Sequence, residues 1–288
     1  MIPALDIRGF TKVYSRGLFG ERRVTGLHDV SLQVDPGEIV AILGMNGAGK
    51  TTLIKCALGL MRPTAGTALV LGCTSVGCGW RGKVGYLPEI ARFPVGMDPL
   101  EVLRFVARVG GTRYDPRRGR MTYWLERLSI PYGKDTHPAL SKGLNRRMGL
   151  ASALMLDPEV LFLDEPSEGL DPVGARVVRE IILESKSRHT AVILSSHILS
   201  EVEQVADRIV ILKKGEVVIS GPLRGLVASV GEQRIVVRGG KGLGMSYVVR
   251  DSIEAGKLLE KLRREGAEVV AVLPVRATLQ EVFERYAL

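Results

Sequence analysis

A glycine-rich stretch near the N-terminus carries residue types that could bind phosphate. The segment GMNGAGKTT, residues 44–52, fits the pattern G-x-x-x-x-G-K-S/T. Glycines allow a backbone to wrap closely around phosphate groups with its N–H groups turned inward. In such a loop Lys50 would place a positive charge on the outer phosphates, and Thr51 would offer its hydroxyl to Mg²⁺. The candidate phosphate-binding residues are Gly44, Asn46, Gly47, Ala48, Gly49, Lys50, Thr51 and Thr52.

Two adjacent carboxylates end an apolar stretch later in the chain. In VLFLDEPS, residues 160–167, four apolar residues suit a strand buried on both faces, yet Asp164 and Glu165 follow them directly. Burying a carboxylate without a partner is costly. Beside a phosphate loop, Asp164 could hold Mg²⁺, directly or through water, and Glu165 could accept a proton from an attacking water. A cation and a reacting water would thus satisfy charges that would otherwise be buried and unpaired.

Short apolar segments alternate with helical patterns through the first 220 residues, and these elements must position the candidate side chains. Fully apolar strands that alternate with helices predict an α/β fold with a parallel sheet covered on both sides. Asp171 is a candidate N-cap before Pro172, at the start of one helix. We expect strands at 38–43, 67–71, 84–87, 160–163, 191–195 and 208–212, and helices at 50–59 and 172–187.

Two regions depart from this alternation. Between about 98 and 155 the pattern becomes mostly helical, which predicts a helical subdomain inserted between two strands of the sheet. After a turn signal at Gly221 and Pro222 the pattern restarts as a β-β-α-β-α unit of about 60 residues. The sequence therefore predicts a larger domain followed by a smaller one, as the length of 288 residues also suggests.

The composition is that of an ordinary soluble globular protein, with 45% hydrophobic and 25% charged residues. No apolar run approaches the roughly 18 residues that a membrane helix needs. The start MIPALDIRGF lacks the layout of a secretory signal. Cys56, Cys73 and Cys78 form no C-x-x-C pair, so neither a zinc site nor a disulfide framework is indicated. We therefore expect a chain that stays in the cytosol.

The net charge of +9 makes an acidic partner plausible. The basic residues lie in short scattered clusters, at 22–23, 117–120, 146–147 and 213–214. Because few aromatic residues accompany them, no nucleic-acid partner is expected. Nucleotide phosphates or an anionic membrane face would use the same charge. For most of these residues, a solvated basic surface is the simplest interpretation.

A further motif resembles one from the nucleotide-binding subunits of ATP-binding cassette (ABC) transporters. The segment LSKGL, residues 140–144, is similar to the family signature LSGGQ and stands shortly before Asp164. It keeps the serine and a glycine of that signature, at Ser141 and Gly143. It departs from the family pattern at Lys142, Leu144 and Asn145.

Other motifs extend this resemblance over about the first 220 residues, in the family's order. SEGLD resembles the loop that follows the Walker B strand, with Glu168 where a small residue is usual. SSH ends at His197 and resembles the family's switch histidine. Tyr14 resembles the aromatic residue that stacks on adenine, and VGYLPE resembles the Q-loop with Glu89 in place of glutamine.

The resemblance implies a P-loop NTPase fold of the ABC type over residues 1–221. This cassette would contain a core with a mixed or parallel sheet, an N-terminal antiparallel β region, and an inserted helical subdomain at about 90–155. Residues 222–288 would form a small α+β accessory domain. Packing or a dimer contact is the simpler role for that domain, and a small-molecule sensor is the alternative.

The resemblance also implies a mechanism that uses ATP and Mg²⁺. Two cassettes, as a homodimer or a pair of related chains, would hold each ATP between one phosphate loop and the other cassette's Ser141 and Gly143. The catalytic residues would be Glu165 and His197. The ligands of Mg²⁺ would be Thr51, Glu89 and Asp164.

Such cassettes pair with a separate membrane permease, which would place the chain on the inner face of the cell membrane. YLPE, LSKG and the ending TLQEVFERY resemble cassettes of drug, polysaccharide or ion-linked exporters. The alternative is a soluble ABC-type ATPase that acts in repair, translation or cluster assembly. Repair relatives carry long insertions and translation relatives carry two cassettes, and neither feature is evident in this sequence.

Overall fold

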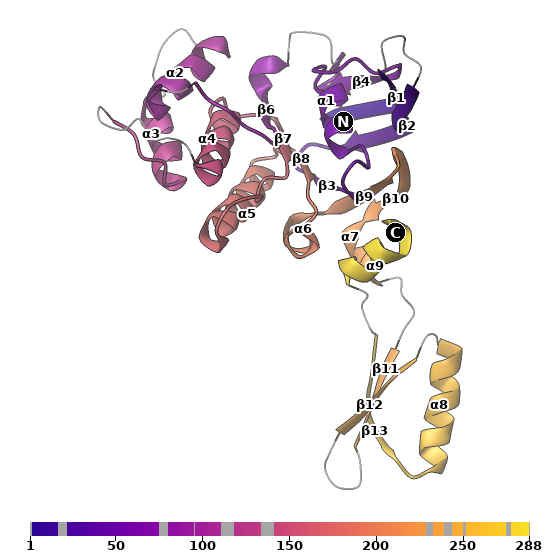
Figure 1. The fold of residues 1–288 in the computed structure, drawn as a ribbon. Helices are drawn as coiled ribbons and strands as arrows, with labels where there is room; N and C mark the ends of the chain where they lie inside the picture. Colours follow the sequence, from indigo (N-terminus) through magenta and orange to yellow (C-terminus); the bar gives the residue numbers. More distant parts are fainter. Residues whose placement is uncertain are drawn as a thin grey trace. The chain divides into compact units, whose positions relative to one another are not determined.

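The computed structural model describes most of the chain, and its contacts divide the chain into two compact units (Figure 1). Unit 1 comprises residues 1–220 with Ala287, and unit 2 comprises residues 221–286. The assignment of the second unit as an accessory domain stays a prediction. The residues described are 2–16, 22–74, 80–94, 96–110, 118–133, 141–228, 233–238, 244–249, 252–274 and 278–287.

The larger sheet of unit 1 is six-stranded, in the order β10-β9-β3-β8-β7-β6. Its inner strands pair in parallel, and every residue of β3, β7 and β8 is buried. This burial explains why those segments are continuously apolar, and it confirms the predicted parallel core. The strands are β3 (Ile39–Leu43), β6 (Val84–Leu87), β7 (Val160–Asp164), β8 (Ala191–Ser195), β9 (Arg208–Lys213) and β10 (Glu216–Pro222).

A second sheet is antiparallel and has the order β2-β1-β4-β5. It confirms the predicted N-terminal antiparallel β region. The segment predicted as a strand at 67–71 forms β4 of this sheet and is not part of the parallel sheet. Phe10 and Leu27 of this sheet share one core cluster with Val40 and Phe162 of the larger sheet. The strands are β1 (Leu5–Arg16), β2 (Arg22–Val34), β4 (Ala65–Val70) and β5 (Cys73–Thr74).

Helices cover both faces of the larger sheet. On one face α1 (Lys50–Ala57) contacts β7 and the antiparallel strands β1, β2 and β4. On the other face Leu194 of β8 lies with Ile182 of α5 (Pro172–Ser187) and Val202 of α6 (Leu199–Val205). Asp171 caps α5 by accepting a hydrogen bond from the N–H of Gly174 at 3.1 Å, as the sequence predicted. A short 3-10 helix, η1 (Arg81–Lys83), precedes β6.

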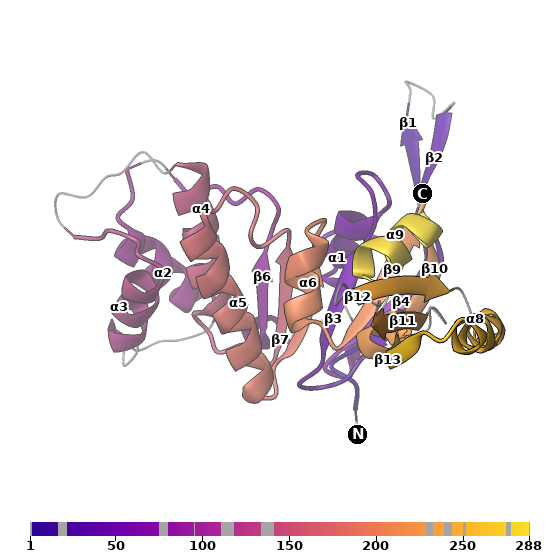
Figure 2. The same ribbon diagram turned by 90° about the horizontal axis from the view of Figure 1, so that it is seen from below.

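The predicted helical insertion consists of α2 (Pro99–Val109), α3 (Arg118–Arg127) and α4 (Lys142–Leu154), which lie together beyond β6 in Figures 1 and 2. Asp98 and Glu101 form a capping box at the start of α2. The guanidinium of Arg127 pairs with the carboxylate of Glu184 on α5 and holds the pKa of that carboxyl below its usual range. This ion pair joins α3 of the insertion to α5, one of the helices that cover the larger sheet.

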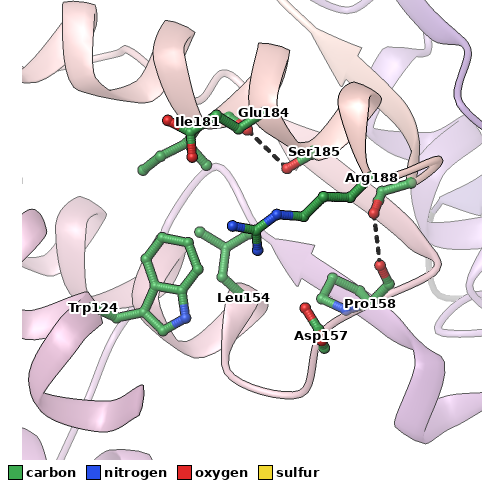
Figure 3. Close-up of a pocket in the computed structure, with 9 residues that line it drawn as sticks. Trp124, Leu154, Asp157, Pro158, Ile181, Glu184, Ser185 and Arg188 are labelled. Carbon is green, nitrogen blue, oxygen red and sulfur yellow. Dashed lines mark hydrogen bonds between the residues drawn. The ribbon is translucent and has the colours of Figure 1, made fainter. Parts of the chain in front are cut away.

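A small cavity lies between the insertion and α5 (Figure 3). Its volume is about 20 Å³, enough for one water molecule. Trp124 of α3 lines it, and the buried Nε1 of this residue has no hydrogen-bond partner within the described ranges. A water in the cavity would give the indole N–H an acceptor.

Unit 2 contains a three-stranded antiparallel sheet in the order β12-β11-β13. Ile235, Val237 and Val249 of this sheet form a core with Ala255 and Leu262 of α8. The β-β-α-β-α order agrees with the sequence pattern, whereas the short helix α7 was not predicted. The elements are α7 (Leu223–Ala228), β11 (Gln233–Arg238), β12 (Gly244–Val249), α8 (Ser252–Arg264), β13 (Glu268–Pro274) and α9 (Leu279–Ala287). Over the described ranges, no helix is both long and apolar enough to cross a bilayer.

The packing of α4 on β6 yields a stability prediction. A Cβ on Gly85 would lie 2.3 Å from the Ala153 carbonyl oxygen and 2.8 Å from Leu161 Cδ1. Gly85→Ala should therefore force α4 away from β6 and cost about 1–3 kcal/mol, typical of overpacking. Differential scanning calorimetry should show a Tm several degrees lower. Gly119→Ala on α3 is the control, because its Cβ meets open space, and an equal Tm in both variants would contradict the prediction.

Candidate active site

The phosphate loop joins β3 to α1 through glycines that no other residue could replace without strain. Gly49 has φ 111°, and a Cβ there would lie 2.5 Å from the Gly26 carbonyl oxygen. A Cβ on Gly44 would lie 2.5 Å from the Leu212 carbonyl oxygen. No side chain caps the start of α1, and its first turn holds no acidic residue. The N–H groups there can accordingly receive an anion, as the sequence predicted.

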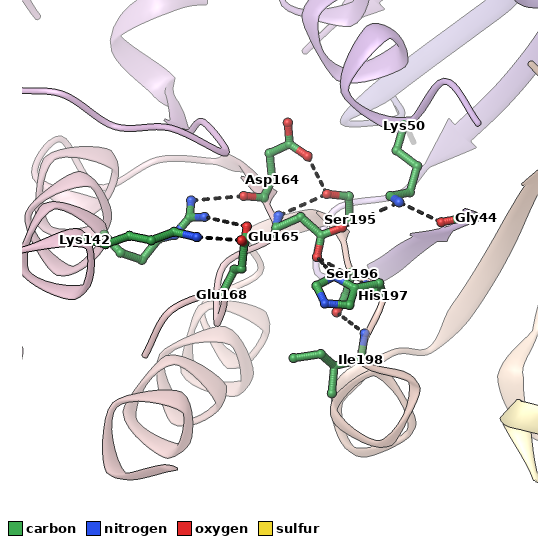
Figure 4. Close-up of polar contacts among 11 residues, drawn as sticks. Gly44, Lys50, Lys142, Asp164, Glu165, Glu168, Ser195, Ser196, His197 and Ile198 are labelled. Atoms are coloured by element: carbon green, nitrogen blue, oxygen red, sulfur yellow. Dashed lines mark hydrogen bonds and ion pairs between the residues drawn. The ribbon is translucent and has the colours of Figure 1, made fainter. Parts of the chain in front are cut away.

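Lys50 is folded back over this loop and is only 7% exposed. Its Nζ donates a hydrogen bond to the Gly44 carbonyl oxygen at 2.7 Å and lies 3.5 Å from Glu165 Oε1 (Figure 4). The structure thus brings the predicted phosphate-binding lysine and the predicted catalytic carboxylate together. A buried ammonium between a carbonyl and a carboxylate is placed to bind a phosphate oxygen.

Asp164 ends β7 and is fully buried. Its Oδ1 accepts a hydrogen bond from Ser195 Oγ at 2.5 Å, whereas its buried Oδ2 has no hydrogen-bond partner within the described ranges. An unpartnered buried carboxylate oxygen suits a cation. The described residues contain no group of three His, Cys, Asp or Glu side chains that could hold a metal ion. The residues fit Mg²⁺, which is bound by few carboxylates and completes its shell with phosphate oxygens and water.

Glu165 follows Asp164 in a strained backbone conformation, with φ 53° and 9% exposure. Its Oε2 accepts a hydrogen bond from the backbone N–H of His197 at 3.2 Å, and His197 Nδ1 lies 2.7 Å from the same oxygen. This contact orients the imidazole and directs Nε2 away from Glu165. The backbone N–H of Glu165 donates to Ser195 Oγ at 3.0 Å. Both predicted catalytic side chains therefore meet at one point.

Tyr14 lies against α1 through its hydroxyl. The hydroxyl oxygen is 2.9 Å from Thr52 Oγ1, and the ring lies so close to Gly26 that a Cβ there would be 2.5 Å from Tyr14 Cε2. Lys12 Nζ lies 5.4 Å from the ring centroid. The ring is thus held beside the phosphate loop, and stacking on adenine stays a prediction.

The signature residues lie on the other side of Asp164 and Glu165 from Lys50, as Figure 4 shows for Lys142. Ser141 is the N-cap of α4 and accepts a hydrogen bond from the N–H of Leu144 at 3.2 Å. Gly143 faces the loop after β7, since a Cβ there would lie 3.2 Å from the Gly169 carbonyl oxygen.

Glu89 is exposed just after β6 and lines a cavity of about 160 Å³. Lys142, Asn145 and Arg146 of α4 line the same cavity. Burial, and to a smaller extent the charges of Asp164 and Glu89, raise the pKa of Tyr86 to about 12. Glu89 thus lies at one cavity with the start of α4, and a role in holding Mg²⁺ stays a prediction.

Sequence reasoning overlooked a second cation at this site. Arg146 belonged to a cluster interpreted as surface charge, yet it is 3% exposed. It donates hydrogen bonds to the carbonyl oxygens of Pro88 and Asp164, at 2.7 and 3.2 Å. No local pattern distinguishes it from its neighbour Arg147, which pairs with Asp171 at 2.7 Å.

Two departures from the family pattern contact each other. Lys142 Nζ lies 2.7 Å from Glu168 Oε1, although one residue is in the signature and the other in the loop after β7. The hydrogen bond from Lys142 holds the pKa of the Glu168 carboxyl below its usual range. Lys142 and Glu168 thus form an ion pair with each other, and this pair accounts for both departures from the family pattern.

Comparisons with known proteins agree with this geometry. The family model described as ABC transporter matches residues 27–168. An uncharacterized ABC transporter ATP-binding protein of Synechocystis is 38% identical over 80% of this chain and 66% of its own length. One of Nostoc is 36% identical over 98% of this chain and 88% of its own. A daunorubicin resistance ATP-binding protein of Streptomyces coeruleorubidus is 33% identical over 97% and 94%.

Solved structures match the fold of the first unit. The ATP-binding subunit of an ABC transporter superposes with a TM-score of 0.70 at 30% identity, over 77% of this chain and 91% of its own. A dimeric ATP-binding cassette bound to ADP and Pi superposes with a TM-score of 0.69 at 24% identity, over 77% and 99%. These matches show the fold of an ATP-binding cassette, and ATP binding by the residues described above stays a prediction.

The unpartnered oxygen of Asp164 yields a prediction. Without nucleotide, Asp164→Asn should raise the Tm by a few degrees, because it removes a fully buried charge. In the wild type, ATP with Mg²⁺ should raise the Tm by more than ATP with EDTA, since a ligand that binds only the folded state stabilises it. Asp164→Asn should lose this Mg²⁺-dependent part.

Differential scanning fluorimetry measures both effects, with the exposed Asp35→Asn as the matched control. A lower Tm for Asp164→Asn, combined with an undiminished Mg²⁺-dependent shift, would contradict a role for this carboxylate in holding the metal.

Proposed function

This chain belongs to the ABC transporter family as an ATP-binding subunit, and we propose that it hydrolyses ATP with Mg²⁺ to drive an exporter. The observation that carries the proposal is the placement of Glu165. Its carboxylate lies between Lys50 at 3.5 Å and His197 at 2.7 Å, directly after Asp164 with its unpartnered oxygen. Phosphate binding, metal binding and proton transfer thus share one small region.

Each residue has a distinct task in the proposed reaction. Lys50 and the N–H groups of the phosphate loop bind the outer phosphates. Asp164 and Thr51 would hold Mg²⁺, and this ion would supply positive charge against the β- and γ-phosphates. Glu165 accepts a proton from the attacking water, and His197 keeps the carboxylate in place. A phosphate oxygen on Lys50 competes with Glu165 for the ammonium, so binding makes the carboxylate available as a base.

We further propose that two cassettes act together. Ser141 and Gly143 flank Lys142 at the start of α4, and Lys142 lies on the far side of Asp164 from Lys50 in Figure 4. Ser141 and Gly143 of a second copy would therefore contact the ATP held by Lys50. The solved dimer of a cassette with the same fold is a precedent for such an assembly. The pair is a homodimer or two related cassettes.

The membrane part of the transporter would be a separate permease chain, which would hold this subunit on the inner face of the membrane. Two relatives are named for resistance to daunorubicin or doxorubicin, and these names support export as the direction of transport. The names of the relatives favour transport over a role in repair, translation or cluster assembly.

The proposed function is tested with Glu165→Gln. This change keeps the size of the side chain and one acceptor oxygen but removes the base, so ATP hydrolysis should fall by about 10²–10⁴-fold. Binding of MgATP, measured by calorimetry, should be retained. Light scattering should show a dimer of this variant with MgATP and a monomer with ADP.

The matched control is Glu180→Gln on the exposed surface of α5, which should hydrolyse ATP at the wild-type rate. Near-normal hydrolysis by Glu165→Gln would remove this residue from the role of base. An oligomer whose size ignores the nucleotide would contradict ATP-driven pairing.

Glu89 is expected to tune the metal requirement. Two unit charges about 4 Å apart interact by about 4 kcal/mol at an effective dielectric of about 20, and water screens part of this at an exposed site. Removing the charge should therefore weaken attraction to Mg²⁺ while relieving repulsion from the γ-phosphate. Glu89→Gln should stay active but need roughly 3–10 times more free Mg²⁺ for half-maximal rate.

The measurement is ATPase activity titrated against free Mg²⁺. The control is Glu159→Gln, an exposed carboxylate before the other end of β7 that pairs with Lys83. An unchanged metal requirement in Glu89→Gln would place Glu89 outside the metal site.

A further inference from the structure

Arg146 is a buried cation that contacts several segments near the catalytic carboxylate. From α4 it reaches the ends of two neighbouring strands, since its Nη1 donates to the carbonyl oxygens of Pro88 after β6 and Asp164 of β7. The side chain is 3% exposed, and burial lowers the pKa of its guanidinium. A positive charge at so buried a position is stable only where nearby polar or negatively charged groups compensate for its lost hydration.

The carbonyl that Arg146 binds belongs to the peptide group that precedes Glu165. The same peptide group donates its N–H to Ser195 Oγ at 3.0 Å and to the Ser195 carbonyl oxygen at 3.1 Å. One peptide plane is therefore held from both sides, by α4 through its oxygen and by β8 through its nitrogen. This matters because Glu165 adopts φ 53°, a conformation that costs energy and persists only where its surroundings impose it.

The charge of Arg146 is balanced mainly by Glu168. Arg146 Nη2 lies 3.6 Å from Glu168 Oε2, beyond hydrogen-bond range, and it has no hydrogen-bond partner within the described ranges. The other oxygen of Glu168 is held by Lys142 at 2.7 Å. The remaining carboxylates that act on Arg146 are Asp164, Glu165 and Glu89.

We propose that Arg146 is a positioning residue for ATP hydrolysis: by holding the Asp164 carbonyl, it fixes the peptide plane that aims the Glu165 carboxylate. Glu168 keeps the guanidinium in place, and Lys142 keeps Glu168 in place. The exposed start of α4 is thereby linked to the catalytic base through direct contacts. This inference rests on the proposed ATPase activity.

The first test is Arg146→Met, which keeps an unbranched side chain but removes the guanidinium and both of its hydrogen bonds. A small misplacement of a catalytic group costs about 10²-fold, so kcat should fall by roughly 10–100-fold. The KM for ATP and the affinity for MgATP should change by less than about two-fold, because the phosphate loop is untouched. Arg147→Met, one position along the same helix, is the matched control and should leave kcat within about two-fold.

The second test uses Arg146→Lys, which also serves if the methionine variant fails to fold. Lysine keeps N–H donors for the carbonyl oxygens of Pro88 and Asp164, so the kcat of Arg146→Lys should lie between those of wild type and Arg146→Met, with the KM for ATP unchanged. A purely structural role would lower the Tm of Arg146→Lys and leave its kcat at the wild-type value.

The outcomes separate the two proposals. If Arg146→Met has the kcat of the wild type, or if Arg146→Lys has the kcat of the wild type together with a lower Tm, Arg146 does not position the base. If the wild type hydrolyses no ATP with Mg²⁺ while binding it, the proposed function itself fails, and the positioning role fails with it.

Discussion

The burial of two adjacent carboxylates at the end of β7 is the constraint on which the rest of the site depends. Asp164 is fully buried and Glu165 nearly so, and each such charge costs several kcal/mol unless its surroundings compensate. The compensation comes from segments far apart in the sequence. Ser195 donates to Asp164, His197 and Lys50 contact Glu165, and Arg146 binds the carbonyl between them. The parallel sheet makes this possible, because the carboxyl ends of β3, β7 and β8 lie at one edge.

The backbone carries as much of this arrangement as the side chains do. Gly49 permits a conformation in which Lys50 turns back over the loop, and Glu165 is held at φ 53° so that its side chain leaves the sheet toward that lysine. Both features would be unfavourable in an isolated segment. They persist here because β3, β7 and β8 are completely buried and cannot relax by moving into solvent. A rigid sheet therefore supports the strained backbone of Glu165, the predicted catalytic residue.

The sequence alone predicts those elements whose residue pattern along the chain directly reflects their burial or chemistry in the fold. Strands β6 and β8 have the predicted bounds, because buried parallel strands are continuously apolar. The phosphate loop is predicted for a similar reason, since its chemistry needs particular residues at fixed spacing. Arg146 could not be assigned in this way. A buried arginine and an exposed one differ only in what other segments bring to them, and Pro88, Asp164 and Glu168 lie 58, 18 and 22 positions away in the chain. The contact between Lys142 and Glu168, 26 positions apart, could not be predicted from the sequence for the same reason.

The two cations near Glu165 differ in what they bind. Lys50 contacts the carboxylate of Glu165, whereas Arg146 contacts backbone carbonyl oxygens. Lys50 shares its ammonium between a carbonyl and the carboxylate itself, at 2.7 and 3.5 Å, so phosphate oxygens that bind it must weaken its hold on Glu165. Arg146 binds carbonyl oxygens instead, and a phosphate on the opposite side does not compete for them. In the proposed reaction, a bound phosphate would thus free the carboxylate of Glu165 from Lys50 while Arg146 keeps the backbone of Glu165 in place.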